Sequence, residues 1–390
     1  MTRPERSACA VLTPPGRGGI AVVRCVGPEC ERAFRECFRP ASRPASLPPA
    51  GGLAYGHVLD DDGLPLDEVI LCRTPDGAFE VNCHGGPAAV AAVCRRLAAL
   101  GLAQVDADRL LEIEGAGPIE REARRALRRA GTTLAARVLL DQLAGALAAA
   151  AAGIDALLAS GRGAEAAAGI DALLAAWQAC GRFLAAPPRI VIAGRPNVGK
   201  STLLNRLAGA DRAITSAASG TTRDYVEADA AIEGLPVVLV DTAGLGEARD
   251  PIERAGVERA RREADRAAVV VYLRDATEGT HPDDVAMLRA LGDRALAAWN
   301  KIDAPGAHPF GGDPKASAPS AALGISALTC AGVEALGRAV LNRLGYRAAA
   351  PGEAVPFTGE QAEALARAKQ SMEQGRLDAA RQALAPLMAG

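Results

Sequence analysis

The spacing of apolar residues changes several times along the chain. Residues 1 to 117 alternate short apolar runs with Gly- and Pro-rich turns, a pattern typical of an α/β domain. Residues 118 to 187 are rich in alanine at helical spacing and predict a helical region. Residues 188 to 346 return to strand-like apolar runs, and residues 347 to 390 predict a linker followed by a helical hairpin.

Local signals refine the two helical parts. The segment A-A-G-I-D-A-L-L-A occurs at 151–159 and again at 167–175. Two copies cannot stack into a repeat array, so we interpret them as a local duplication of one helical unit. In the C-terminal hairpin, Thr358 and Gln361 have the spacing of a capping box, and Gly375 separates two apolar-periodic stretches.

A phosphate-binding motif, G-x-x-x-x-G-K-S, lies between the apolar run 189–193 and the apolar-periodic segment 202–207, which is the strand and helix context that it requires. In such a loop, backbone N–H groups surround the phosphates, Lys200 reaches the β and γ phosphates, and the Ser201 hydroxyl ligates Mg²⁺. The chain is therefore predicted to bind a nucleoside triphosphate. The candidate ligands are Gly194, Asn197, Val198, Gly199, Lys200, Ser201 and Thr202.

The sequence N-K-I-D follows the strand-like segment 294–299 and predicts the base. Asp303 can accept hydrogen bonds from both the N1 and the N2 donors of guanine, an arrangement that adenine does not offer. Asn300 and Lys301 would brace the loop and cover the base. A backbone N–H from Ser326-Ala327-Leu328 would meet the guanine carbonyl. Together with the phosphate-binding motif, this order of motifs predicts a GTP-binding protein.

Two further segments are placed to sense the γ-phosphate. Asp241-Thr242-Ala243-Gly244 follows the apolar run 235–240, so Asp241 could hold Mg²⁺ through water while the Gly244 amide points at the γ-phosphate. The segment 220–224, G-T-T-R-D, offers a threonine hydroxyl to the metal. We expect both to be switch segments that are ordered by the γ-phosphate and Mg²⁺ and released on hydrolysis.

Overall composition limits the choice of partners. Apolar residues make up 49% of the chain, which is enough for substantial cores, but aromatic residues only 3%. The net charge of −2 argues against a binder of nucleic acid that depends mainly on electrostatics. The basic run 121–129 could still contact RNA, or could be a solvated helix face balanced by Glu120 and Glu122.

The remaining features favour the cytoplasm. The nine cysteines include no C-x-x-C pair, which suits reduced thiols better than a disulfide framework. The four histidines have no metal-ligand spacing. Residues 1–10 do not resemble a signal peptide, and no uninterrupted apolar run has transmembrane length, so we expect no membrane association.

The motifs together resemble one family. G-R-P-N-V-G-K-S, G-T-T-R-D, D-T-A-G-L, N-K-I-D and S-A-L are similar to the GTPase domain of the tRNA modification GTPase family MnmE, also called TrmE. The stretches 13–24 and 80–86 independently resemble that family's N-terminal signatures. The resemblance implies a tetrahydrofolate-binding α/β domain, a helical region, a Ras-like P-loop GTPase domain and a C-terminal helical hairpin. The GTPase domain, or G domain, at 188–346 is expected to have a mostly parallel sheet with helices on both faces.

The resemblance also implies how GTP is hydrolysed. In this family two G domains dimerise around a K⁺ ion, which neutralises transition-state charge in place of an arginine finger. The motif match assigns the catalytic roles to Glu253, which would orient the attacking water, and to Gly244 and Thr222. From sequence alone, Glu253 also fits an ordinary first-turn helix glutamate. The implied metal ligands are Ser201, Thr222 and Asp241 for Mg²⁺, and Asn197, Ser216, Ala218 and Thr221 for K⁺.

The implied folate site is matched only in part. Arg24 and Glu80 match positions that hold the pterin and glutamate parts of 5-formyltetrahydrofolate in the family. The family's N-x-K-x-D-L stretch has no counterpart in residues 118–133. The chain ends in 385–390, A-P-L-M-A-G, where the family has C-x-G-K, whose cysteine is linked to the modification chemistry.

Three functional interpretations follow. The first is a K⁺-stimulated, homodimeric GTPase that works with an MnmG-like flavoprotein to install a carboxymethylaminomethyl-type group on the wobble uridine of tRNA, with folate as the one-carbon source. The second is a diverged paralogue that acts as a GTP-dependent switch without this chemistry, which the altered C-terminal segment favours. The third, GTP binding without hydrolysis, is the least consistent with the matched K⁺ loop and Glu253.

Overall fold

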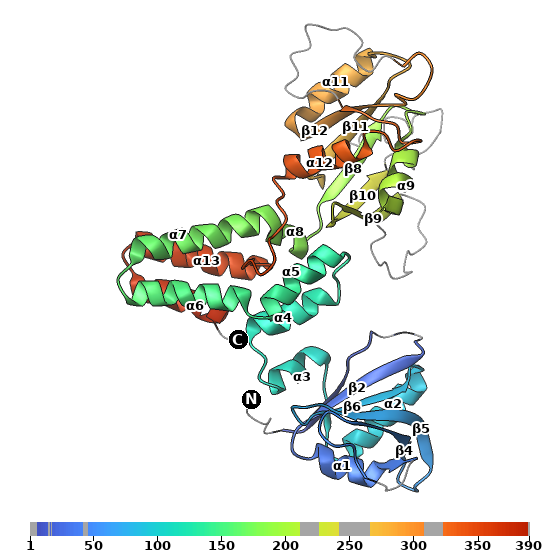
Figure 1. Cartoon of the computed structure of the whole chain (residues 1–390), viewed down its shortest axis with the longest axis vertical. Coiled ribbons are helices and arrows are strands. Elements are labelled where there is room, and N and C mark those ends of the chain that lie inside the picture. The colour runs from blue at the N-terminus through green and yellow to red at the C-terminus, as the bar shows by residue number, and fades with distance from the viewer. Residues whose placement is uncertain are drawn as a thin grey trace, which may run out of the picture. The chain divides into compact units, whose positions relative to one another are not determined.

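The computed structural model describes residues 6–14, 16, 18–41, 46–210, 226–241, 266–307 and 323–388 (Figure 1). The chain divides into two compact units, one that ends at Arg121 and one that begins at Glu122.

The first unit is built on a seven-stranded sheet in the order β3-β4-β5-β6-β2-β1-β7. Neighbouring strands are antiparallel except β1 and β7, which are parallel. Helices α1 and α2 pack on one face of the sheet, and α3 packs on the other face against β1. The bounds are β1 Ala8–Val11, β2 Ile20–Val26, α1 Cys30–Cys37, β3 Phe38–Pro40, β4 Leu53–Leu59, β5 Pro65–Arg73, β6 Phe79–His84, α2 Pro87–Ala99, β7 Ala103–Gln104 and α3 Ala107–Ile113.

Cysteines form part of the core of this unit. All nine cysteines are free. Six of them belong to the cluster between the sheet and helices α1 and α2, where a thiol packs as a small apolar side chain. Burial raises the pKa of Cys9 and of Cys30 to about 12, so these thiols stay protonated and unreactive.

The helical part of the second unit comes from both sides of the G domain. Helices α6 and α7 pack against α13 and α14 to form a bundle (Figure 1). At the start of α13, Thr358 Oγ1 accepts from the Gln361 N–H at 3.3 Å, while Gln361 Oε1 accepts from the Phe357 N–H at 2.8 Å, a variant of the predicted capping box. The bounds are α4 Pro118–Leu127, α5 Thr133–Leu143, α6 Ala146–Ala159, α7 Gly163–Ala176, a π-helical turn Trp177–Gly181, α8 Arg182–Ala185, α13 Gly359–Glu373 and α14 Leu377–Met388.

The two copies of the duplicated segment lie in α6 and α7, and each forms an equivalent ion pair with the C-terminal hairpin. Asp155 pairs with Arg381 on α14, and its counterpart Asp171 pairs with Lys369 on α13, each at 2.7 Å. The hairpin is thus fixed by both copies of one helical unit, through charges at the same position of the repeat.

The equivalent glycines of these copies should respond oppositely to alanine. A Cβ on Gly153 would meet nothing within 4 Å, whereas a Cβ on Gly169 would lie 2.9 Å from Ile154 Cγ1. Because alanine favours the helix by about 0.5–1 kcal/mol, we expect Gly153→Ala to raise the midpoint of thermal unfolding by about 1–4 °C. Gly169→Ala should lower it, since overpacking costs about 1–3 kcal/mol. Shifts of the same sign and size in both variants would contradict this packing.

No single helix in the described part of the chain has both the length and the apolar composition to span a membrane. Among the described helices, only α5 and α6 taken together have the length and composition of a candidate membrane span, and this pair is bent by 45°.

The G domain contains a six-stranded sheet in the order β13-β12-β11-β8-β10-β9. All neighbouring pairs are parallel except β9 and β10, which confirms the predicted mostly parallel sheet. Helices α9 and α12 pack on one face and α11 on the other. The bounds are β8 Arg189–Gly194, α9 Lys200–Ala210, β9 Val226–Ile232, β10 Leu235–Asp241, β11 Val269–Asp275, α11 Pro282–Leu291, β12 Ala295–Asn300, β13 Leu323–Gly324 and α12 Val333–Leu344.

Candidate nucleotide-binding site

The phosphate loop joins the end of β8 to the start of α9, and its conformation requires the glycines of the motif. Gly194 has a φ of 144°, and a Cβ there would lie 2.4 Å from the Leu273 carbonyl oxygen. Gly199 has a φ of 95°, and its Cβ would lie 2.3 Å from Asn300 Nδ2. Both the backbone conformation and the available space therefore exclude a side chain.

Lys200 points back at the phosphate loop. Its Nζ donates to the carbonyl oxygens of Gly194 at 3.0 Å and Arg195 at 2.8 Å, and only 7% of the residue is exposed. Burial lowers the pKa of Lys200, and the charge of Asp241 opposes this shift only in part. Phosphates bound in the loop would supply the negative charge that compensates this buried ammonium group.

The predicted Mg²⁺ ligands in the described part of the chain lie together. Ser201 Oγ donates to Asp241 Oδ2 at 2.7 Å, and Asp241 is 2% exposed at the end of β10. No group of three or more His, Cys, Asp or Glu side chains with metal-site geometry occurs among the described residues. A hydroxyl and one carboxylate fit Mg²⁺, which completes its shell with water and phosphate oxygens and neutralises their charge.

Asn300 connects the phosphate loop to the segment 326–328. Its side chain is 3% exposed, donates through Nδ2 to the Val198 carbonyl at 2.7 Å, and accepts through Oδ1 from the Ala327 N–H at 2.9 Å. Both the phosphate loop and the predicted base loop are thereby fixed by one buried amide.

The remaining residues of the predicted base site differ in their exposure. Asp303 is exposed, and Lys301 Nζ pairs with Asp275 Oδ2 at 2.5 Å. Although burial opposes it, the hydrogen bond from Lys301 lowers the pKa of Asp275. Ser326 is fully buried, while Leu328 is 66% exposed and its carbonyl accepts from Arg206 at 2.7 Å.

Some predicted residues lie outside the described part of the chain. These are Ser216, Ala218, Thr221, Thr222, Thr242, Ala243, Gly244 and Glu253.

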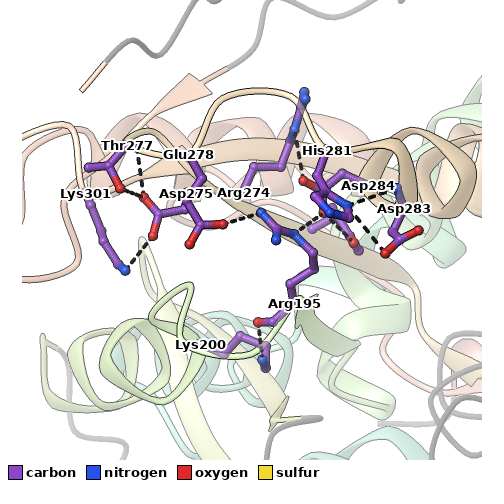
Figure 2. Close-up of polar contacts among 11 residues, drawn as sticks. Arg195, Lys200, Arg274, Asp275, Thr277, Glu278, His281, Asp283, Asp284 and Lys301 are labelled. Carbon is purple, nitrogen blue, oxygen red and sulfur yellow. Dashed lines mark hydrogen bonds and ion pairs between the residues drawn. The ribbon is translucent and has the colours of Figure 1, made fainter. Parts of the chain in front are cut away.

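Sequence reasoning missed the ion pairs that support the two loops. Arg195, inside the phosphate motif, pairs with Glu278 and with Asp284, and Asp275 holds Lys301 (Figure 2). Asp275 could have been noticed as a carboxylate at the end of a buried strand, a usual position for site residues in parallel sheets. The partners of Arg195 come from more than 80 positions away and carry no local signal.

Comparison with known proteins identifies the family. Residues 7–108 match the model described as "GTP-binding protein TrmE N-terminus", and residues 189–301 match "50S ribosome-binding GTPase". The "tRNA modification GTPase MnmE" of Thermus thermophilus is 35% identical over 94% of this chain and 88% of that protein. The proteins of the same name from Thiobacillus denitrificans and Chloroflexus aurantiacus are each 33% identical, over 95% and 86% of this chain and 88% and 81% of their own lengths. This chain belongs to the MnmE family.

Membership in the MnmE family makes the chain a GTP-binding GTPase. Solved structures match over smaller parts: Era from Aquifex aeolicus bound to GDP.AlF4⁻ is 27% identical over 48% of this chain and 67% of that chain, with a TM-score of 0.30. The family assignment therefore rests on the relatives whose similarity extends over 86–95% of this chain.

The two signature stretches of the MnmE family meet in the first unit. They line a cavity of about 410 Å³ together with α2, and the Gly85 N–H donates to the Gly19 carbonyl at 3.1 Å. Arg24 lies on β2 away from the lining of this cavity. Its guanidinium binds three carboxylates, those of Asp76 at 2.9 Å, Glu80 at 2.8 Å and Glu114 at 2.7 Å. Arg24 and Glu80 are thus partners of each other.

Proposed function

We propose that this chain is a K⁺-stimulated GTPase whose G domains dimerise during hydrolysis, and that it works with an MnmG-like flavoprotein to modify the wobble uridine of tRNA. The observation that carries the proposal is the combination of a TrmE-type N-terminal domain with a GTPase domain in one chain, shared with relatives named tRNA modification GTPases. A GTPase domain alone would not indicate a role at tRNA.

The K⁺ assignment comes from the family resemblance, and the chemistry of hydrolysis supports it. Negative charge spreads over the phosphate oxygens in the transition state and must be neutralised, which Mg²⁺ and Lys200 do only in part. Asn197 lies on the phosphate loop with a φ of 62°, in the left-handed region that asparagine tolerates. We assign its side-chain oxygen to K⁺, together with oxygens of Ser216, Ala218 and Thr221, and we assign Glu253 to the attacking water.

We also propose that 5-formyltetrahydrofolate binds to the first unit. The cavity between the two signature stretches supports this assignment because its volume of about 410 Å³ is in the range of small-molecule sites. Arg24 and Glu80 are assigned to the folate by the family resemblance alone, because neither residue is part of the lining of this cavity. Titration calorimetry with 5-formyltetrahydrofolate tests this part, and heats equal to those of dilution would contradict it.

The K⁺ mechanism is tested by GTP hydrolysis at matched ionic strength in KCl and in NaCl. We expect the wild type to hydrolyse GTP at least tenfold faster in KCl, since one added charge contact in a transition state is worth orders of magnitude in rate. Asn197→Ala should lose this difference while binding GTP in NaCl like the wild type. Asn342→Ala, an exposed asparagine on α12, is the matched control and should keep the K⁺ response.

The same experiment separates the alternatives. Equal slow rates in both salts would contradict K⁺ activation and favour a GTP-dependent switch without modification chemistry. If the wild type shows the K⁺ response, the next measurement is tRNA modification in the presence of an MnmG-like partner.

A further inference from the structure

A buried carboxylate lies beside the phosphate loop. Asp284, in the first turn of α11, is completely buried, whereas the adjacent Asp283 has an exposed side chain. Burying a charged carboxylate costs several kcal/mol unless it is paired. Asp284 Oδ1 accepts from Tyr272 Oη at 3.0 Å and from Arg195 Nε at 3.3 Å. Its Oδ2 lies 3.8 Å from Arg274 Nε and has no hydrogen-bond partner among the described residues.

Arg195 connects this carboxylate to the phosphate loop itself. It is the second residue of the motif, and its backbone carbonyl is one of the two oxygens that hold Lys200 Nζ. The Arg195 guanidinium points away from the loop, toward Asp284 and toward Glu278, which it meets at 2.5 Å (Figure 2). Fixing this side chain therefore fixes the backbone that positions the phosphate-binding lysine.

Arg274 connects Asp284 to the neighbouring strand β12. The guanidinium of Arg274 lies 3.9 Å over the ring of Trp299, the residue before Asn300. Arg274 and Arg195 place two cations around one carboxylate. If Asp284 were neutral, the two guanidinium groups would face each other with less compensating charge, and Arg195 would lose one of its two acidic partners.

We propose that Asp284 is a positioning residue for GTP hydrolysis: through Arg195 it holds the phosphate loop in the conformation that receives the nucleotide. Such preorganisation lowers the cost of ordering the loop when GTP binds. In the described part of the chain, Asp284 forms no hydrogen bond or ion pair with Lys200, Ser201 or Asp241, and its direct link to the phosphate loop is Arg195.

The test is a double-mutant cycle in the full-length protein with Asp284→Asn and Arg195→Gln, measuring the dissociation constant of a non-hydrolysable GTP analogue, KM, kcat and the unfolding midpoint. We expect each single variant to weaken nucleotide binding about tenfold and to raise KM more than it lowers kcat. The double variant should bind like the weaker single variant. Losses that multiply would show that the two residues act independently and would overturn the proposal.

Two controls separate positioning from stability. Tyr272→Phe removes the other hydrogen bond to Asp284 Oδ1 and should lower the unfolding midpoint while changing nucleotide affinity less than twofold. Asp283→Asn makes the same substitution at the exposed neighbour and should bind the nucleotide within about threefold of the wild type. If Asp284→Asn destabilises the protein but binds the analogue like the wild type, the carboxylate is structural and the proposal is wrong. If that variant does not fold, wild-type affinity in Arg195→Gln would overturn the proposal equally.

Discussion

Replacing Asp303 by asparagine is expected to weaken GTP binding by about 10²- to 10⁴-fold and to give the site affinity for xanthosine triphosphate. In our assignment the Asp303 carboxylate accepts from both N1–H and the N2 amino group of guanine. Two hydrogen bonds to a charged acceptor are worth about 1.5–3 kcal/mol each. An asparagine presents an NH₂ group where guanine also donates, whereas xanthine carries a carbonyl at that position.

The measurement is competition of GTP and xanthosine triphosphate for a fluorescent nucleotide bound to the wild type and to Asp303→Asn. Asp293→Asn, an exposed aspartate elsewhere in the G domain, should leave both affinities unchanged. Loss of GTP binding without a gain of xanthosine triphosphate would indicate damage to the loop. Unchanged GTP affinity would show that Asp303 does not contact the base.

The strands that position the site were predictable because each is a short apolar run. Segments 189–193, 235–240 and 294–299 cover all but the last residue of β8, β10 and β12 respectively. Motif residues that follow such strands must collect at one edge of a parallel sheet, which brings Gly194, Asp241 and Asn300 together. Strand periodicity and motif order therefore contain enough information to locate the site.

The contacts that support the site were not predictable, because they depend on which strands become neighbours. β11 adds to the sheet beside β8, and only this pairing places Tyr272 and Asp284 next to Arg195. The sequence does not show which of the adjacent carboxylates, Asp283 or Asp284, is buried. The two residues differ only in the side of α11 on which they lie.

The helical bundle illustrates the same limit. The duplicated segments have identical sequences and identical helix propensity, yet Gly153 meets open space and Gly169 meets Ile154. Their partners on α13 and α14 lie more than 190 positions further along the chain. Local sequence predicted the helices, and only the tertiary structure distinguishes the two copies.

The second large effect is expected for Asn300→Ala, because one buried side chain joins two loops. Removing its amide leaves the Val198 carbonyl without its Nδ2 donor and the Ala327 N–H without its acceptor. Each buried group left unsatisfied costs about 1–3 kcal/mol, so the G domain should lose about 2–6 kcal/mol of unfolding free energy. Part of the loss should appear as weaker GTP binding, since Gly199 packs against the same amide and Ala327 belongs to the base loop.

Scanning calorimetry with and without GTP measures both effects of Asn300→Ala. The unfolding transition that GTP raises belongs to the G domain, because a ligand stabilises only the part that binds it. We expect this transition to move to lower temperature in the variant, and its GTP-induced increase to shrink. Asn82→Ala, at an asparagine on β6 of the first unit that donates to the Ile70 carbonyl, should leave the GTP-sensitive transition in place. A variant with the wild-type transition and the wild-type response to GTP would show that the phosphate loop and the base loop hold their positions without Asn300.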